Sequence, residues 1–188
     1  MDSFVALMNF AAQVFAVEKA AATSDPESFV RSIAQRTAAL LGCPDLVVAL
    51  QVDAKIEALH RTNPRFSWTG IYRKTGNTLT VCCYRGPLTP HAVIPLDHGI
   101  CGAAVREGKT LNIPDVKADP RYLSCDFRTK SEIVVPIFSP SGEAIAEIDI
   151  DSHELNAFTT QDQVTLEQMA RELSPLMLQL VSENEVTP

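Results

Sequence analysis

The chain has 188 residues, of which 46% are hydrophobic and 21% are charged, a composition typical of a globular protein and unlike that of a disordered one. Its 16 Lys and Arg residues stand against 23 Asp and Glu residues, which gives a net charge of −7, and the chain has no basic cluster. Nucleic acids and anionic membranes are bound through clustered cationic side chains, so we expect neither as a partner.

Two helices are predicted in the N-terminal region. Apolar residues between Phe4 and Phe15 recur at helical spacing, which gathers them on one face. A second helix is expected to begin at Asp25, a capping residue followed by Pro26 in the first turn, and to end at Gly42. We expect both helices to pack on the main domain.

The predicted domain organisation is N-terminal helices in residues 1–43, a main domain in 44–182 and a tail in 183–188. The apolar N-terminal stretch is too short for a membrane span, and its Met-Asp-Ser start lacks the basic residues of a secretory signal. We therefore interpret the protein as cytoplasmic. In that compartment we expect reduced thiols at all five cysteines, which are Cys43, Cys82, Cys83, Cys101 and Cys125.

Segments rich in β-branched and aromatic residues predict a β-sheet in the main domain. A hairpin is expected where KTGN joins SWTGIYR to TLTVCCYR, and the further expected strands are AVIPL, TLNIPDV, EIVVPIF and AIAEIDID. The expected helices are residues 45–60, the segment GICGAAVREGK, and a long final helix that opens with a capping-box pattern at Thr160. The tight connections favour an α+β fold, an antiparallel sheet with helices packed on one face.

Two cysteines have surroundings that could favour a reactive thiolate. Cys101 lies in HGICGAA at the expected start of a helix, where the helix dipole lowers a thiol pKa. The alternative is a small residue needed for close packing. Cys125 lies in a charged loop where Arg128 and Lys130 would also favour the thiolate, and its alternative is an exposed cysteine of ordinary reactivity.

A row of acidic residues is expected on one of the last two strands. Glu147, Asp149 and Asp151 alternate with Ile148 and Ile150, so the carboxylates share one face and the isoleucines the other. A solvated sheet face would explain the carboxylates without any function. If loops cover that face as well, the carboxylates line a pocket instead.

Aromatic and histidine residues give weaker signals. Trp68 and Tyr72 lie four apart on a strand and share a face, either in the core or as an aromatic wall for a small ligand. The four histidines (His60, His91, His98 and His153) lack metal-ligand spacing, so we expect no metal site.

Several segments together resemble the GAF-domain family of free methionine-(R)-sulfoxide reductases. They are FSWTGIY, VIPLDHGICGAAVREGKT, IPDV, LSCDFRTKSEIVVPIF, EIDIDS and FTTQDQ, in the family's order over residues 66–165. The resemblance implies a GAF-like antiparallel sheet and a thiol-dependent reduction of free L-methionine-(R)-sulfoxide. It also implies a thioredoxin-like reductant and no cofactor.

The resemblance also assigns residues to roles. Cys125 corresponds to the family's catalytic cysteine and Cys101 to a second cysteine, while the substrate-binding carboxylates would be Glu132, Asp149 and Asp151. The family's third, resolving cysteine is absent. His91 occupies its place, as a plain loop residue or as a group that assists proton transfer.

Two other functions remain open on the sequence. One is a non-catalytic GAF module that senses a small ligand, and the other is a redox sensor in which Cys101 and Cys125 signal by oxidation. The retained cysteine and carboxylates favour the enzyme, whereas the missing third cysteine favours the sensors. A homodimer through the terminal helices is compatible with their apolar stripes.

Overall fold

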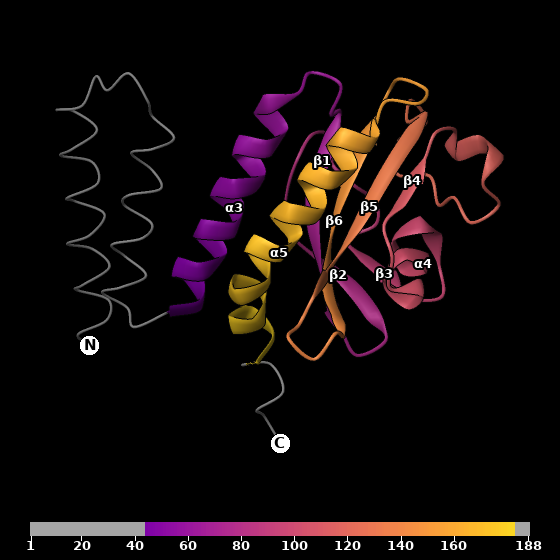
Figure 1. Ribbon diagram of the computed structural model, residues 1–188. Coiled ribbons are helices and arrows are strands. Elements are labelled where there is room, and N and C mark those ends of the chain that lie inside the picture. The colour runs from indigo at the N-terminus through magenta and orange to yellow at the C-terminus, as the bar shows by residue number, and fades with distance from the viewer. Residues whose placement is uncertain (1–43, 183–188) are drawn as a thin grey trace, which may run out of the picture. The chain divides into compact units, whose positions relative to one another are not determined.

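The computed structural model describes residues 44–182, so both predicted N-terminal helices and the tail lie outside the described residues (Figure 1). The first described element, helix α3 (Pro44–Thr62), confirms the helix favoured over residues 45–60. The strands follow in the predicted order and form one six-stranded sheet, β3-β2-β1-β6-β5-β4, in which all neighbours are antiparallel. Their bounds are β1 Trp68–Thr75, β2 Thr78–Arg85, β3 Val93–Pro95, β4 Leu111–Ile113, β5 Ser131–Phe138 and β6 Ala144–Ser152.

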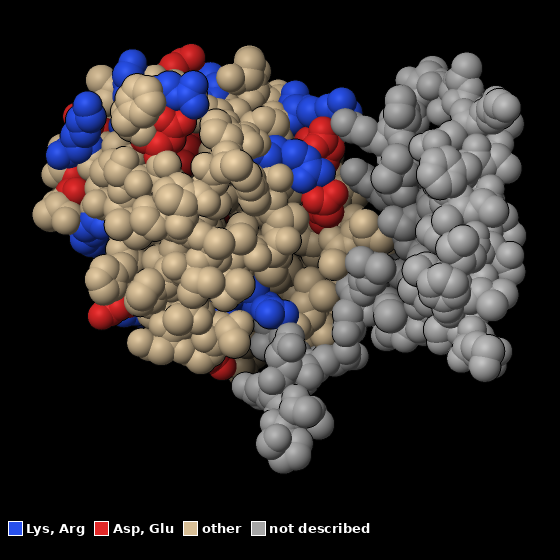
Figure 2. All heavy atoms as spheres, turned by 180° about the vertical axis from the view of Figure 1, so that it is seen from behind, with Lys and Arg blue, Asp and Glu red and all other residues tan. Residues whose placement is uncertain are grey.

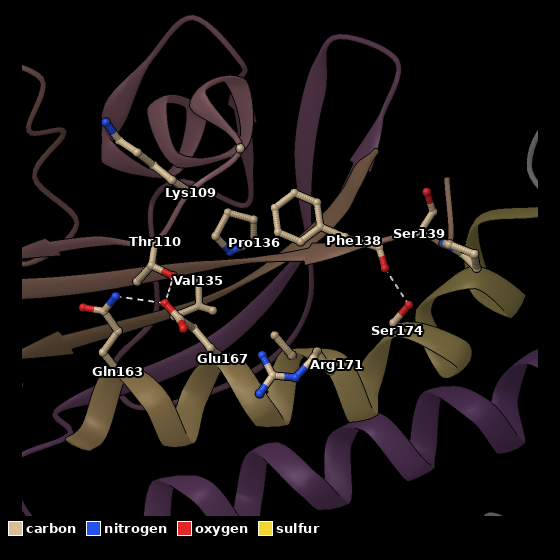
Figure 3. A pocket seen from close by; sticks show the side chains of 13 residues that line it. Lys109, Thr110, Val135, Pro136, Phe138, Ser139, Gln163, Glu167, Arg171 and Ser174 are labelled. Atoms are coloured by element: carbon tan, nitrogen blue, oxygen red, sulfur yellow. Dashed lines mark hydrogen bonds between the residues drawn. The ribbon is translucent and has the colours of Figure 1, made fainter. Parts of the chain in front are cut away.

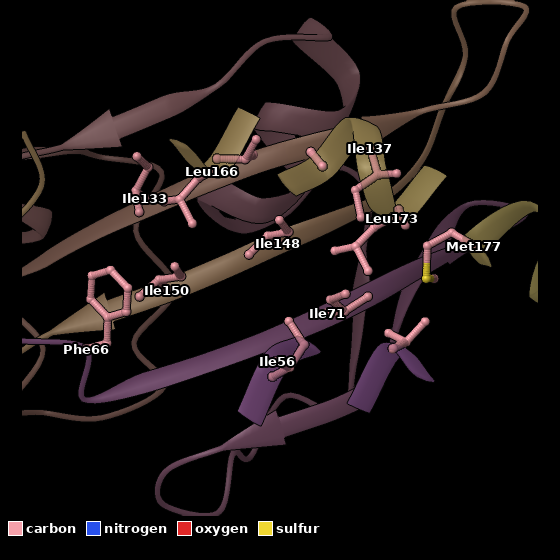
Figure 4. Close-up of a cluster of buried hydrophobic side chains, with 14 of the residues drawn as sticks. Ile56, Phe66, Ile71, Ile133, Ile137, Ile148, Ile150, Leu166, Leu173 and Met177 are labelled. Carbon is pink, nitrogen blue, oxygen red and sulfur yellow. The ribbon is translucent and has the colours of Figure 1, made fainter. Parts of the chain in front are cut away.

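One face of the sheet is apolar and lies against the long helices, as predicted from the sequence. Alternate residues of the central strands point to this face because side chains of a strand alternate between its two sides. They meet α5 (Thr160–Ser182) and the part of α3 that follows residue 50 (Figure 4). The buried residues of this cluster include Ile56, Ile71, Ile133, Ile148, Ile150, Leu166, Leu173 and Met177.

The other face is covered by a short helix and by loops. Helix α4 (Gly99–Glu107) is the predicted segment between glycines, and it ends at Gly108, whose φ of 60° is the left-handed conformation that favours glycine. Gly102 lets α4 approach the end of β3 closely, since a Cβ atom there would lie 2.4 Å from the carbonyl oxygen of Leu96. A second cluster of buried apolar side chains lies on this face, and it includes Val116 of the 3-10 turn η1 (Val116–Ala118).

The charged side chains lie mainly around the edge of this second face. Figure 2 views the molecule from the side opposite to Figure 1, and Lys, Arg, Asp and Glu gather toward the margin while uncharged residues form the centre. Among the described residues, no helix is both long enough and apolar enough to cross a membrane.

Candidate active site

The acidic row of β6 is buried rather than solvated. Asp149 and Asp151 point to the α4 side of the sheet, and Glu132 of β5 lies directly opposite Asp151 in the strand register. None of these three side chains is more than 5% exposed, and Glu147 at the start of the row is 0% exposed. The alternative of a solvated acidic face is therefore wrong for this protein.

Helix α4 brings Cys101 onto these carboxylates. The Cys101 Sγ lies 3.8 Å from Glu132 Oε1, and one possible ligand atom from each of Cys101, Glu132 and Asp149 falls within 4.8 Å of the others. The absence of metal-ligand spacing among the histidines predicted no metal site, and this cluster contains no histidine. Its composition, acidic and thiol-bearing, suits a cationic ligand or proton transfer.

Burial and mutual repulsion raise the pKa values of these acids. Desolvation is the main cause at each position, and it raises the pKa of Asp149 to about 7. The pKa of Glu132 is raised first by burial and then by the charges of Asp149 and Asp151, and the pKa of Asp151 by burial and then by Asp149. Several of these groups therefore hold protons near neutral pH, as expected for crowded buried carboxyls.

Of the two alternatives for Cys101, a reactive thiolate and a small residue needed for close packing, the lowered thiol pKa of the first is wrong. Burial raises the pKa of its thiol, and the neighbouring charges of Asp149, Glu147 and Glu132 raise it further. The start of α4 does place Cys101 near unpaired amides, but these contributions outweigh a helix dipole that is worth about 1 kcal/mol.

The lowered thiol pKa that Arg128 and Lys130 suggested for Cys125 is also wrong. Cys125 is half-buried in the loop between η1 and β5, with its Sγ 3.7 Å from the carbonyl oxygen of Leu123. Arg128 does not stabilise a thiolate at Cys125, because its guanidinium forms an ion pair with Asp126, with the two atoms 2.7 Å apart. Burial raises the pKa of the Cys125 thiol, and the charges of Asp149, Asp151 and Glu132 add to that effect. The thiol and the carboxylates are thus electrostatically coupled.

The two predicted aromatic residues stand on the same face as the carboxylates. The Trp68 and Tyr72 rings stack with centroids 6.0 Å apart, and both belong to the buried cluster on the α4 side. The Tyr72 hydroxyl donates a hydrogen bond to the carbonyl oxygen of His91 at 3.0 Å. Both residues are therefore part of the core, and Trp68 also forms part of the wall of a cavity beside Cys125.

That cavity is small and lies under two loops. It has about 10 Å³ of free volume, and its wall is formed by Ser67, Trp68, Pro87, Leu88, Thr89, Cys125, Asp126, Thr129, Asp151 and His153. His91 links the two loops through a hydrogen bond between its Nε2 and the carbonyl oxygen of Ser124, 3.2 Å away. A ligand larger than water therefore needs these loops to separate.

Sequence reasoning missed several lining residues. Thr89 and Thr129 offer hydroxyls near the thiol, and His153 lies 3.8 Å from Asp126. Only the loop arrangement brings these residues together, since no spacing pattern in the sequence connects them.

A larger cavity lies elsewhere and contains none of the predicted site residues. It measures about 660 Å³ and lies between the C-terminal end of α4, β5 and α5 (Figure 3). Glu167 accepts hydrogen bonds there from Thr110 and Gln163, and Ser174 donates to the carbonyl oxygen of Phe138. Its size alone does not outweigh the chemistry of the carboxylate and thiol cluster.

The six-stranded antiparallel sheet, with α5 on one face and α4 and loops on the other, defines an α+β domain whose buried acids lie on the α4 side. The chain belongs to the GAF domain family, whose model matches residues 25–175. This confirms the fold and the family that the sequence predicted.

Within that family the chain is similar to methionine sulfoxide reductases. It is 36% identical over 108 residues to the free methionine-R-sulfoxide reductase of Saccharomyces cerevisiae, a match that spans 56% of this chain and 59% of the yeast protein. The type II free methionine-R-sulfoxide reductase of Thermoplasma acidophilum shares 37% identity, with a TM-score of 0.69 over 71% of this chain and 94% of that one. The Neisseria meningitidis reductase, solved in complex with its substrate, shares 26% identity, with a TM-score of 0.65 over 87% and 96%.

Proposed function

We propose that this protein reduces free L-methionine-(R)-sulfoxide to methionine, with Cys125 as the nucleophile. The observation that carries the proposal is the buried group of Glu132, Asp149 and Asp151, of which Asp151 lines the same cavity as Cys125. The similarity to free methionine-R-sulfoxide reductases supports the same reaction.

The carboxylates are suited to hold the ammonium group of a free amino acid. Buried negative charges are costly when unpaired, and an entering cation relieves that cost. Asp149 and Asp151 would take this role, and the stacked Trp68 and Tyr72 rings would bound the apolar part of the side chain. Peptide-bound methionine sulfoxide lacks the free ammonium inside a chain, so we expect it to be a poor substrate.

The chemical step moves one proton and one oxygen. Cys125 gives its proton to a neighbouring carboxylate, and the resulting thiolate attacks the sulfoxide sulfur. The sulfoxide oxygen takes a proton from a carboxylic acid such as Glu132, and the sulfur–oxygen bond of the substrate breaks. The released hydroxide then attacks the Cys125 sulfur and breaks the bond between that sulfur and the substrate sulfur. The products are methionine and a sulfenic acid on Cys125, so the substrate is reduced and the cysteine oxidised.

Substrate binding would help to form the thiolate. In the ligand-free site the charges of Asp149, Asp151 and Glu132 disfavour a second negative charge at Cys125. The substrate ammonium offsets those charges, which lowers the cost of deprotonating the thiol. The nucleophile is thus activated when the correct ligand is present.

The sulfenic acid must then be resolved. The Cys101 thiol would attack the Cys125 sulfur, forming a disulfide and releasing water, with the Cys101 proton passing to the departing hydroxyl through Glu132, whose Oε1 lies 3.8 Å from the Cys101 Sγ. A thioredoxin-like dithiol would reduce the disulfide. In this scheme Cys101 replaces the absent third cysteine, and a proton-transfer role for His91 remains a prediction, as does a homodimer.

The decisive experiment is a turnover assay with free L-methionine-(R)-sulfoxide and dithiothreitol. Cys125→Ser should lose roughly 10³-fold or more of kcat/KM, because it removes the nucleophile. Cys101→Ser should keep turnover with dithiothreitol and lose it with thioredoxin. Cys82→Ser is the matched control, because Cys82 is an exposed thiol outside the site. No turnover by the wild-type protein with excess dithiothreitol would exclude the reductase and favour a ligand sensor.

A further inference from the structure

Glu147 is a buried acid that the proposed reaction does not use. Its side chain is 0% exposed, and neither of its oxygens has a hydrogen-bond partner among the described residues. Asp149, two residues along the same face of β6, has one such unpartnered oxygen, Oδ1. An unpartnered buried polar group is destabilising, so two such residues on one face of a strand call for an explanation.

The neighbours of this pair cannot supply a strong donor. On β1, Tyr72 lies opposite Glu147, but its hydroxyl donates to the carbonyl oxygen of His91. On β5, Pro136 lies opposite Glu147 and has no polar side chain. On α4, the Cys101 thiol lies 3.8 Å from Glu132 Oε1. As a donor it also offsets part of the rise that burial causes in the pKa values of Glu147 and Asp149, but a thiol is a weak donor that cannot satisfy three acids.

We propose that Glu147 is a positioning residue that donates a hydrogen bond from its carboxylic acid to Asp149 Oδ1 and so holds Asp149 as the anion that binds a substrate ammonium. Residues two apart on a strand share one face, so the Glu147 and Asp149 side chains are neighbours on the α4 side of β6. This role rests on the proposed function of Asp149.

The electrostatics of the pair support this arrangement. Burial and the charge of Asp149 both raise the pKa of Glu147, and burial raises the pKa of Asp149 to about 7. Two carboxyls so close in a buried site do not both ionise, and they titrate as a pair that keeps one proton over a wide pH range. Glu147 carries that proton, because burial and the charge of Asp149 both favour its neutral form.

The test is a ¹³C NMR titration of the Asp149 carboxyl carbon in the ligand-free protein, in wild type, Glu147→Gln and Glu147→Leu. We expect the wild type to show two steps, one below pH 7 and one above it. Glu147→Leu should show a single step near pH 7, and Glu147→Gln, which keeps a neutral donor, a single step below pH 7. Glu143→Leu, an exposed site just before β6, is the matched control and should titrate like wild type.

Steady-state kinetics of the same Glu147 variants separate the positioning role of Glu147 from the proposed reductase function. At pH 7, Glu147→Leu should raise KM for free methionine sulfoxide about tenfold with little change in kcat, and Glu147→Gln should restore the wild-type KM. The same titration curve in wild type and Glu147→Leu would overturn the hydrogen bond. The expected titration with an unchanged KM would overturn its role in binding. The titration needs no substrate, so it stands even if the wild type lacks reductase activity.

Discussion

The two faces of the sheet are buried to a similar degree but by opposite chemistry. On the α5 face, apolar side chains such as Ile148 and Leu173 pack with no exposure at all. On the α4 face, Glu132, Asp149 and Asp151 are also almost fully buried, although they are acids. Both sets of side chains come largely from the same strands, and Ile148 and Asp149 are neighbours in sequence.

This contrast separates stability from function within one sheet. The apolar face gains free energy from burial, at about 25 cal/mol per Å² of apolar surface. The acidic face loses free energy when its carboxyls ionise, which raises their pKa values. A protein retains such a costly face when the same groups bind a ligand or move protons. Substitutions and pH changes that act on one face alone can test this division, from the largest expected effect to the smallest.

The largest expected effect is a pH dependence of stability that originates on the acidic face. The pKa of Asp149 is about 7 in the folded protein, against 3.8 for an unperturbed aspartic acid. The folded state therefore binds more protons between these values, and stability falls as pH rises through this window. Unfolding by urea at pH 5 and pH 8 should differ by about 2–3 kcal/mol from Asp149 alone, with the protein less stable at pH 8.

The control for this effect is Asp149→Asn, which cannot ionise. It should reduce the pH dependence between pH 5 and pH 8, to which Glu132 and Asp151 also contribute, without lowering stability at pH 8. Equal stability of the wild type at both pH values would contradict the assignment of raised pKa values to the acidic face.

A comparably large effect is expected from a cavity on the apolar face. Leu173 of α5 has no exposed surface and belongs to the apolar cluster on the α5 side of the sheet (Figure 4). Leu173→Ala should lower the free energy of unfolding by about 2–5 kcal/mol, with KM for methionine sulfoxide changed by less than about twofold. Val164→Ala on the same helix is the control, because Val164 is half exposed. An increase in KM at Leu173→Ala would mean that the two faces are not independent.

For an acid on the α4 face, we expect a loss of activity without a loss of stability. Asp151→Asn keeps the shape of the side chain but removes the charge that would pair with the substrate ammonium. We expect kcat/KM to fall roughly 100-fold while the free energy of unfolding at pH 8 stays equal or rises. A stability loss as large as that of Leu173→Ala would show that Asp151 is structural.

Most of this fold could be predicted from the sequence, because the period of a strand is a local property. Each predicted strand is present, and the alternation of Ile148, Asp149 and Ile150 correctly placed the acids on one face. The resemblance of these segments to GAF-type reductases also indicated the family. These features need only the order of residues along the chain.

The electrostatic state of the site could not be predicted in the same way. Charged neighbours in the sequence suggested a lowered pKa for Cys125, but Arg128 turns to Asp126 and the acids that approach the thiol come from β5 and β6. Burial and approach across the fold, rather than sequence neighbours, decide such shifts. The lining residue Thr89 was missed for the same reason.

The smallest effect concerns the start of α5, outside both faces. The capping box was predicted at Thr160, but the structure places it one residue earlier. The Thr159 hydroxyl accepts from the amide of Asp162 at 3.1 Å, and Asp162 Oδ2 accepts from the amide of Thr159 at 2.8 Å. Thr159→Ala should lower the free energy of unfolding by about 1 kcal/mol and leave KM unchanged, whereas Thr159→Ser should retain most of the stability. Because this cap secures α5 without touching a carboxylate of the site, its loss should weaken the apolar face alone. A changed KM in Thr159→Ala would show that the position of α5 is transmitted through the sheet to the acids.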